Sequence, residues 1–189
     1  MLVQRFFAHM HPNHPFLHRP SFGKIVNALY ECAATPPDSP IQYNGWPATV
    51  ASFSCNGEEH ILQGRSMIPI PVHVGAFQLL LIMSIGATLQ IRKRQYQHNP
   101  GTFFRSAISL SNHVFGSISI PTLQAVLLLL LHGLIDPAEG CNIWTLTHLA
   151  MAYAVDLGIH RRVRPRGKFS DQAVRMRQRI FYCVYSLDR

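Results

Sequence analysis

Acidic side chains are scarce in this sequence of 189 residues. Nine Asp and Glu stand against 17 Lys and Arg, and charged residues make up only 14% of the chain. The carboxylates are scattered, apart from Glu58 and Glu59, which argues against a carboxylate-based enzyme. The nucleotide-binding patterns G-x-x-x-x-G-K-[ST] and G-x-G-x-x-G do not occur, nor does the hydrolase pattern G-x-S-x-G. We therefore predict that the chain is not an enzyme and has no catalytic residues.

Cysteine is also sparse, and its four positions are far apart. No C-x-x-C pair occurs, so the sequence predicts neither a zinc site nor a small disulfide framework. Three of the cysteines stand in apolar helical surroundings, where buried free thiols and a reducing compartment are expected. We predict no metal and no cofactor for this chain, whose cysteines are Cys32, Cys55, Cys141 and Cys183.

Four histidines near the N-terminus form the one pattern that suggests a metal. They are His9, His11, His14 and His18. Prolines between them favour a rigid turn, however, and neither a preceding strand nor a downstream carboxylate completes a metalloenzyme site. A small His-dependent metalloenzyme stays as an alternative hypothesis.

Unbroken apolar runs are short as well. The most apolar stretch, residues 125–131, is far shorter than the roughly 20 residues that cross a bilayer. Arg5 and His9 interrupt the apolar N-terminus, which argues against a signal peptide. We predict no membrane partner and a buried core helix around residues 125–131.

Apolar residues make up 48% of the chain and recur with helical spacing. We predict an all-α fold of about seven helices in one domain, residues 1–189. A proline-rich loop or insertion at residues 34–72 is expected to be attached by Trp46 and Phe53, and Ser21 and Ser119 are predicted N-caps. The expected helices are residues 2–11, 22–33, 72–94, 102–115, 123–135, 142–157 and 171–188.

The helix expected at residues 142–157 carries two apolar rows, one through Ala150 and one through Trp144 and Val155. Two apolar rows indicate contact with two neighbouring elements. We therefore predict that this is a central helix with two neighbours, and that Gly158 ends it.

Several arginine residues follow this helix, and further arginines lie in the last helix. Such a basic cluster can bind nucleic acid or an acidic partner, and the alternative interpretation is a solvated loop and helix face. The candidate interaction face consists of Arg161, Arg162, Arg164, Arg166, Lys168, Arg175 and Arg179.

Four segments carry a resemblance to a known family. They are residues 6–22, 120–125, 144–160 and 177–189. The first contains His11-Pro12 and Pro15-Phe16-Leu17-His18, the second reads I-P-T-L-Q-A, and the third reads W-x-L-x-x-x-A-x-x-x-A-x-x-L-G-I-H. In this order they resemble the fungal-specific transcription factor domain, the regulatory middle region of fungal zinc-cluster (Zn2Cys6-type) transcription factors.

The resemblance implies a nuclear, all-α domain that regulates transcription as part of a larger factor. DNA and zinc binding are implied for the whole factor, through a Cys-rich cluster that these cysteines do not form. The family normally continues through further helices, so a partial regulatory domain is expected. The implied partners are other proteins of the transcription machinery and a small-molecule effector. The alternative is a stand-alone helical module for protein interaction or small-ligand sensing that lacks DNA binding.

The chain departs from the family pattern at three positions. His148 and Ala152 stand where the family often has Gly and Arg, and Tyr182 stands where it often has Trp. We expect the His148 side chain to push bulk into a tight helix contact.

Overall fold

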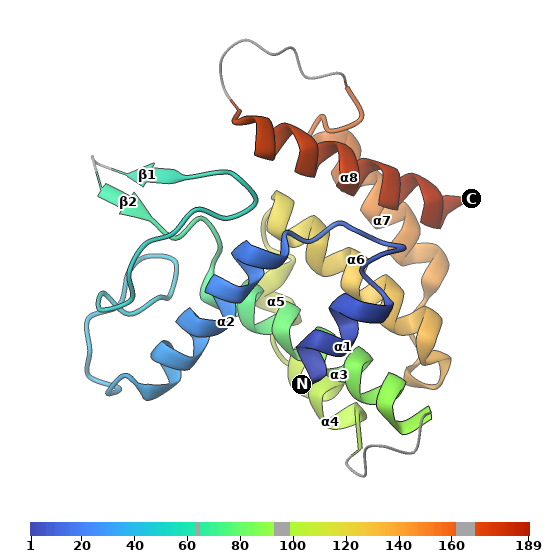
Figure 1. Ribbon diagram of the computed structural model, residues 1–189, viewed down its shortest axis with the longest axis horizontal. Helices are drawn as coiled ribbons and strands as arrows, with labels where there is room; N and C mark the ends of the chain where they lie inside the picture. The colour runs from blue at the N-terminus through green and yellow to red at the C-terminus, as the bar shows by residue number, and fades with distance from the viewer. Residues whose placement is uncertain (63–64, 93–98, 162–168) are drawn as a thin grey trace.

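The computed structural model describes residues 1–62, 65–92, 99–161 and 169–189. In this part of the chain, eight α-helices and one 3-10 helix pack around a shared core, and the strands form a single short hairpin (Figure 1). The predicted all-α fold class is confirmed. The helices are α1 (Leu2–His9), α2 (Arg19–Ala34), α3 (Val72–Arg92), α4 (Gly101–Ile108), α5 (Ser111–Val114), α6 (Ile120–Ile135), η1 (Pro137–Glu139), α7 (Ile143–Asp156) and α8 (Asp171–Asp188).

Helix α6 is the central element of the domain. Fourteen of its 16 residues are buried, including all of residues 127–131, and it packs against both α3 and α7. Ser119 caps it as predicted, because the Ser119 hydroxyl accepts a hydrogen bond from the Thr122 amide at 3.2 Å. A helix that is apolar on every side is stable only when it is covered on every side. Helices α3, α7 and α8 contact α6, whereas α1, α2, α4 and α5 pack against α3.

The prediction that the helix at residues 142–157 contacts two neighbouring elements is confirmed. Helix α7 contacts α6 and α8, and Ala150 and Tyr153 are buried on its inner side. The second apolar row is largely uncovered, since Trp144 is 70% exposed and Val155 is 51% exposed. Periodicity reveals that a row is apolar, but it does not reveal whether a neighbour covers that row.

Helix α3 is also a core helix. Its stretch Val72–Ile91 is long and apolar enough to cross a bilayer, yet more than half of this stretch is buried inside the domain. Phe77, Leu81 and Ile85 have no exposed surface, and the helix packs against α1, α4 and α6. The last two residues of the predicted helix, 93–94, lie outside the described residues.

Helix α2 begins earlier than predicted. His18 holds the N-cap position, and its Nδ1 atom accepts a hydrogen bond from the Ser21 amide at 3.3 Å. Pro20 occupies the first turn, where its missing N–H is not needed. The prediction of Ser21 as the cap is therefore wrong. The Ser21 hydroxyl instead accepts a hydrogen bond from the Asn56 amide at 3.2 Å.

The single helix predicted for residues 102–115 is broken into α4 and α5. The Leu110 amide donates to the Ala107 carbonyl at 2.9 Å, three residues back instead of four. The Ser109 hydroxyl donates to the Ser106 carbonyl at 2.8 Å. Local side-chain bonds of this kind compete with regular helix geometry. The break accounts for the one helix beyond the predicted seven.

The proline-rich segment between α2 and α3 is ordered where the structure describes it. Trp46 is completely buried, and its indole N–H donates to the Ile70 carbonyl at 2.6 Å. Phe53 packs half-buried against the core, so the predicted attachment by these two aromatic residues is confirmed. The segment is more than a loop, however, because strands β1 (His60–Leu62) and β2 (Arg65–Met67) pair antiparallel within it.

A tight turn at Asn56 and Gly57 lies within this segment. Cys55 and Glu58 exchange backbone hydrogen bonds of 2.9 and 2.8 Å across it. Both turn residues have positive φ, 57° for Asn56 and 82° for Gly57. This backbone conformation is the one for which the dipeptide Asn-Gly is preferred in two-residue hairpin turns.

The turn at Asn56 and Gly57 packs against the start of α8. The Ser170 hydroxyl donates to the Gly57 carbonyl at 2.7 Å. A Cβ atom added at Gly57 would lie 2.7 Å from the backbone nitrogen of Ala173, so only glycine fits here without a shift. The proline-rich segment is thereby fixed against the last helix.

Gln124 joins this turn to the centre of the domain. Its Nε2 atom donates to the Phe16 carbonyl at 2.6 Å, and its Oε1 atom accepts from Asn56 Nδ2 at 2.9 Å. Gln124 is 2% exposed and Asn56 is 5% exposed, so both amides are removed from water. Buried polar groups are stable only with partners. The network therefore sets the position of α6 relative to the N-terminal and proline-rich segments.

Replacing Gln124 by Leu leaves the Phe16 carbonyl and the Asn56 amide group without their partner. Since each buried unsatisfied group costs about 1–3 kcal/mol, we expect Gln124→Leu to lower the free energy of unfolding by about 3 kcal/mol. Gln4→Leu, at an exposed position of α1, is the matched control and should change it by less than about 0.5 kcal/mol. The free energies of unfolding of the two variants are measured by urea denaturation, with circular dichroism as the signal. If Gln124→Leu and Gln4→Leu lowered the free energy of unfolding equally, the hydrogen bonds of Gln124 would not stabilise the fold.

Gly57 and Gly140 both have positive φ, 82° and 72°. An alanine strains the backbone by about 1–2 kcal/mol at either position. A Cβ at Gly140 meets nothing within 4 Å, whereas at Gly57 it meets α8. We therefore expect Gly57→Ala to lower the free energy of unfolding by about 3 kcal/mol and Gly140→Ala by about 1 kcal/mol, both measured by urea denaturation. If the two variants lost the same stability, the turn would not be packed against α8.

Candidate interaction face

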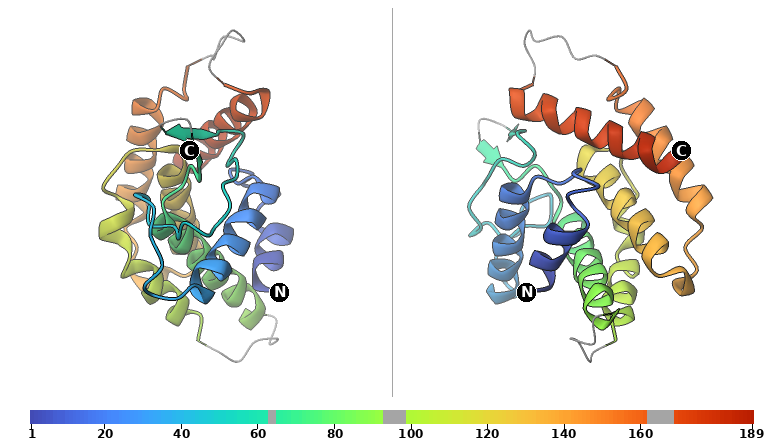
Figure 2. Two further views of the ribbon diagram at one scale, coloured as in Figure 1. Left: turned by 90° about the vertical axis from the view of Figure 1, so that its left-hand side faces the viewer. Right: turned by 45° about the vertical axis from the view of Figure 1, so that its right-hand side comes forward.

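Helix α8 lies at the edge of the domain and crosses α7 (Figure 2). The Ser170 hydroxyl caps it by accepting a hydrogen bond from the Ala173 amide at 3.1 Å. Its inward stripe is buried as the spacing predicts, with Ala173, Met176 and Ile180 among the buried residues. Because this stripe holds α8 in one rotational setting, the opposite side of the helix faces solvent.

The solvent-facing side of α8 is rich in arginine and tyrosine. Its residues recur three or four positions apart, so they share one side of the helix. Tyr182 is 68% exposed and Tyr185 is 45% exposed, and the Arg189 guanidinium lies 5.2 Å from the centre of the Tyr185 ring. We name this surface the α8 face, and it consists of Arg175, Gln178, Arg179, Tyr182, Tyr185 and Arg189.

The structure describes three of the predicted interaction residues, and all three are exposed. Arg175 and Arg179 lie on the α8 face. Arg161 follows Gly158, which ends α7 with a φ of 64° as predicted, and its Nε atom donates to His160 at 3.2 Å. Neither Arg175 nor Arg179 forms an ion pair with any described residue. The other predicted members, Arg162, Arg164, Arg166 and Lys168, lie outside the described residues.

Tyr182, Tyr185 and Arg189 were not among the predicted interaction residues. The signal that identifies them is their helical spacing from Arg175 and Arg179, which places them on the same side of α8. Arginine and tyrosine are enriched among the residues that dominate binding at protein interfaces. Because the Arg175 and Arg179 guanidinium groups form no ion pair within the described ranges, this composition makes the α8 face the candidate site for a protein partner.

Arg177 belongs to the same arginine-rich stretch but points inward. Its side chain is only 14% exposed, and its Nη2 and Nε atoms donate to Glu58 Oε1 at 2.9 and 3.2 Å. The guanidinium carbon also lies 4.1 Å from the centre of the Phe169 ring, and Nη1 donates to the Leu157 carbonyl at 3.5 Å. Arg177 therefore connects α8 to the end of α7 and to the proline-rich segment.

Two of the four N-terminal histidines, His11 and His18, form hydrogen bonds within the fold. His11 donates to a backbone carbonyl at 2.7 Å, and the Gln172 amide lies 3.0 Å from the His18 ring. Burial lowers the pKa of His11, His14 and His18, and the positive charge of Arg179 lowers it further for His11 and His18. Among the described residues, no group of three or more His, Cys, Asp or Glu side chains is placed to hold a metal ion.

The cysteines are all free thiols. Burial raises the pKa of Cys55 to about 12, with a further contribution from the negative charge of Glu58, and burial raises the pKa of Cys183 to about 11. A thiol that stays protonated is a poor nucleophile and a poor metal ligand. These two cysteines therefore act as small apolar groups of the core.

The three departures from the family pattern lie on the surface. His148, Ala152 and Tyr182 are all exposed. The His148 ring lies 4.1 Å from the Trp144 ring, and its Nδ1 atom lies 2.8 Å from the Trp144 carbonyl. The expectation that His148 crowds a tight helix contact is wrong, because this side of α7 faces solvent. The departures alter the surface and leave the core unchanged.

Comparison with known proteins identifies the family. The family model described as fungal specific transcription factor domain matches residues 73–189, which is more than half of the chain. The chain belongs to this family. The matched region of the fungal specific transcription factor domain runs from α3 to α8, so it includes both the central helix α6 and the α8 face. No solved structure matches the chain.

Similar curated proteins are named as regulators. Activator of stress genes 1 of Saccharomyces cerevisiae is 28% identical over 173 residues, 92% of this chain and 15% of that protein. Negative regulator of pleiotropic drug resistance STB5 of Candida glabrata is 29% identical over 119 residues, 60% of this chain and 12% of that protein. Pyrimidine pathway regulatory protein 1 of Saccharomyces cerevisiae is 30% identical over 124 residues, 65% of this chain and 13% of that protein. The chain thus spans less than a sixth of the length of these relatives.

Arg175 and Arg177 are a matched pair, because they stand on the same helix and face opposite directions. We expect Arg177→Gln to lower the free energy of unfolding by about 2 kcal/mol, because the charged hydrogen bond to Glu58 and the contact with Phe169 are lost. Arg175→Gln should change it by less than about 0.5 kcal/mol. Urea denaturation of the two variants tests this difference, and comparable losses would mean that Arg177 is not an internal connection.

Proposed function

We propose that this chain regulates transcription in the nucleus as the regulatory domain of a fungal zinc-cluster transcription factor, and that it does so by binding another protein through the α8 face. The family and the named regulators similar to the chain support the first part. The exposed arginine and tyrosine side chains of α8 support the second part, and they are the observation that carries the proposal.

DNA binding and zinc binding are proposed only for the whole factor. A zinc cluster needs several cysteines with close spacing, and the four cysteines of this chain are far apart in sequence. This domain would therefore act by contact with proteins and not through a zinc cluster of its own. It would have no catalytic role in the factor.

The proposed mechanism couples the α8 face to the rest of the domain. Arg177 and Ser170 attach α8 to Glu58 and Gly57 of the proline-rich segment, and Gln124 attaches that segment to α6. A partner that moves α8 would strain these contacts. A rearrangement of the other helices would in turn change the position of the α8 face. The linked contacts thus allow binding at one surface to be transmitted through the fold.

The test fuses the 189-residue chain to an unrelated DNA-binding domain and measures output from a reporter gene in a fungal cell. We expect Arg175→Glu with Arg179→Glu, or Tyr182→Ala alone, to bring reporter output back to the level of the DNA-binding domain without the chain. A loss of partner affinity of about tenfold, or about 1.4 kcal/mol, is expected from the reversed charges.

Two matched controls make the result specific. Lys24→Glu with Arg105→Glu removes the same amount of charge from exposed positions of α2 and α4, and Tyr30→Ala removes an equally exposed tyrosine, since Tyr30 is 69% exposed. Both controls should keep the reporter output of the unchanged chain. Circular dichroism verifies that every variant is folded. The proposal fails if folded variants of the α8 face and the controls give the same output.

A further inference from the structure

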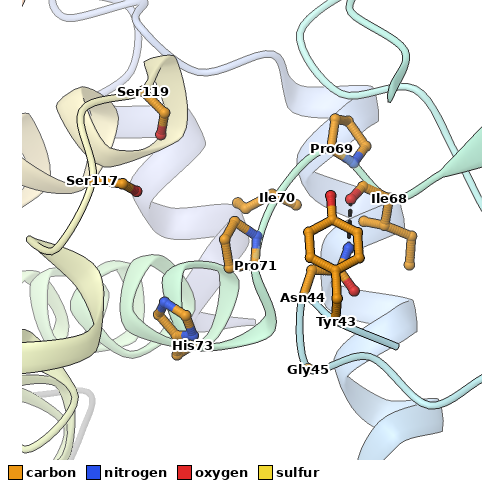
Figure 3. Close-up of a pocket in the computed structure, with 10 residues that line it drawn as sticks. All are labelled: Tyr43, Asn44, Gly45, Ile68, Pro69, Ile70, Pro71, His73, Ser117 and Ser119. Atoms are coloured by element: carbon orange, nitrogen blue, oxygen red, sulfur yellow. Dashed lines mark hydrogen bonds between the residues drawn. The ribbon is translucent and has the colours of Figure 1, made fainter. Parts of the chain in front are cut away.

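Two hollows of the domain differ in the side chains that line them. The larger has a volume of about 580 Å³ and lies between the proline-rich segment and the start of α3 (Figure 3), and none of its described lining residues is Lys, Arg, Asp or Glu. The smaller has a volume of about 350 Å³, lies between α1 and α2, and combines apolar walls with an arginine. We name it the α1–α2 groove, and its lining includes Val3, Phe7, Arg19, Phe22, Gly23 and Val26.

The α1–α2 groove forms because both helices pack against α3 and lie side by side there (Figure 2). Phe7 and Phe22 join the two helices at one end, where their ring centres are 5.7 Å apart. Val3 and Val26 lie further along the groove, and both are only partly buried. The two helices therefore leave an apolar channel that is open to solvent.

Gly23 keeps this channel open. It stands inside α2, where glycine destabilises a helix relative to alanine. A Cβ atom added at Gly23 would meet nothing within 4 Å, so packing among the described residues does not require glycine at this position. Glycine also serves where a ligand approaches the backbone closely. The missing side chain thus leaves room in the groove that the fold itself does not use.

Arg19 gives the α1–α2 groove a positive charge at the end where the helices meet. Its guanidinium carbon lies 5.8 Å from the centre of the Phe7 ring. The side chain is exposed, and it forms no ion pair with any described residue. No Asp or Glu is among the described residues that line the groove, and the one acidic residue of the two helices, Glu31, lies near the far end of α2. A carboxylate is complementary to this end, because a guanidinium binds both carboxylate oxygens at once.

We propose that the α1–α2 groove binds the anion of a free carboxylic acid with a medium-length alkyl chain. The carboxylate pairs with Arg19, and the chain lies along Gly23 to Val26, which are covered on binding. The helix rises about 10 Å from Arg19 to Val26, so a chain of the length of octanoate fills this part of the groove. The site lies outside residues 73–189, the region that matches the family model, and it does not rest on the α8 face.

The test uses octanoate as the probe and octanamide as its matched control, because the two share the alkyl chain and differ in charge. Binding is followed by NMR titration of the 189-residue chain at neutral pH. We expect octanoate to cause saturable shifts at Val3, Gly23 and Val26 with a Kd on the order of 1 mM, as for a small ligand in an open groove. Octanamide should bind about fivefold more weakly, because it lacks the ion pair with Arg19.

Replacement of Arg19 tests the charge. Arg19→Gln should weaken octanoate binding about fivefold and leave octanamide binding unchanged. It should not unfold the chain, because a positive charge at the start of a helix is unfavourable. Lys24→Gln, at an exposed position of α2 that does not line the groove, should bind both probes as the unchanged chain does. Equal affinity for the two probes, or the same loss of octanoate binding in both variants, would overturn the role of Arg19.

Replacement of Gly23 tests the channel. Gly23→Phe should fill it and abolish octanoate binding, whereas Lys24→Phe should bind octanoate normally. Both positions are exposed, so both variants should fold, which circular dichroism checks. Tyr30→Ala should also bind octanoate, because Tyr30 lies about 16 Å from Arg19 along α2, beyond the end of the chain. The proposal is overturned if octanoate causes no saturable shifts at the groove, or if Gly23→Phe binds it as well as the unchanged chain. These outcomes do not depend on the reporter assay of the α8 face.

Discussion

The side chain of Gln124 holds together segments that are far apart in the sequence. From the middle of the most deeply buried helix it reaches the backbone of Phe16 and the amide of Asn56. An amide in this position is stable only because both of its ends are paired, so the N-terminal segment and the proline-rich segment must each take one position relative to α6. Gln124, Phe16 and Ser21 all belong to segments that carry the family resemblance, and in the structure these segments meet.

The constraint continues from Gln124 to the surface. Asn56 and Gly57 form a tight turn against the start of α8, and Glu58 pairs with Arg177 one and a half turns further along that helix. The inward residues of α8 are thus held at several points, which leaves its arginine and tyrosine side chains in a defined orientation toward solvent.

The sequence was sufficient for features that depend on local pattern. Apolar periodicity predicts the helices, and Ser119 predicts the start of α6.

The errors arise where contacts between segments that are distant in the sequence decide the structure. His18, not Ser21, caps α2, since Ser21 is engaged by Asn56, and residues 102–115 break because serine side chains compete with the backbone. The spacing of Trp144 and Val155 predicts a buried row, although each of these side chains is at least half exposed. On α8, the arginines share one stretch of sequence, but only the packing separates inward Arg177 from outward Arg175 and Arg179. The Asn-Gly dipeptide is a local signal for the hairpin turn, but its contacts with α6 and α8 are not local.

The most direct measurement is hydrogen–deuterium exchange at single amides of the 189-residue chain. If the proline-rich segment is fastened to the core, the amides of Cys55, Asn56 and Glu58, which donate to Glu58, Ser21 and Cys55, should be protected to a degree comparable with amides of α6. If these three amides exchange at the rate of an unstructured peptide while α6 stays protected, the segment is not part of the cooperative unit. The connection between α6, the turn and α8 would then be wrong.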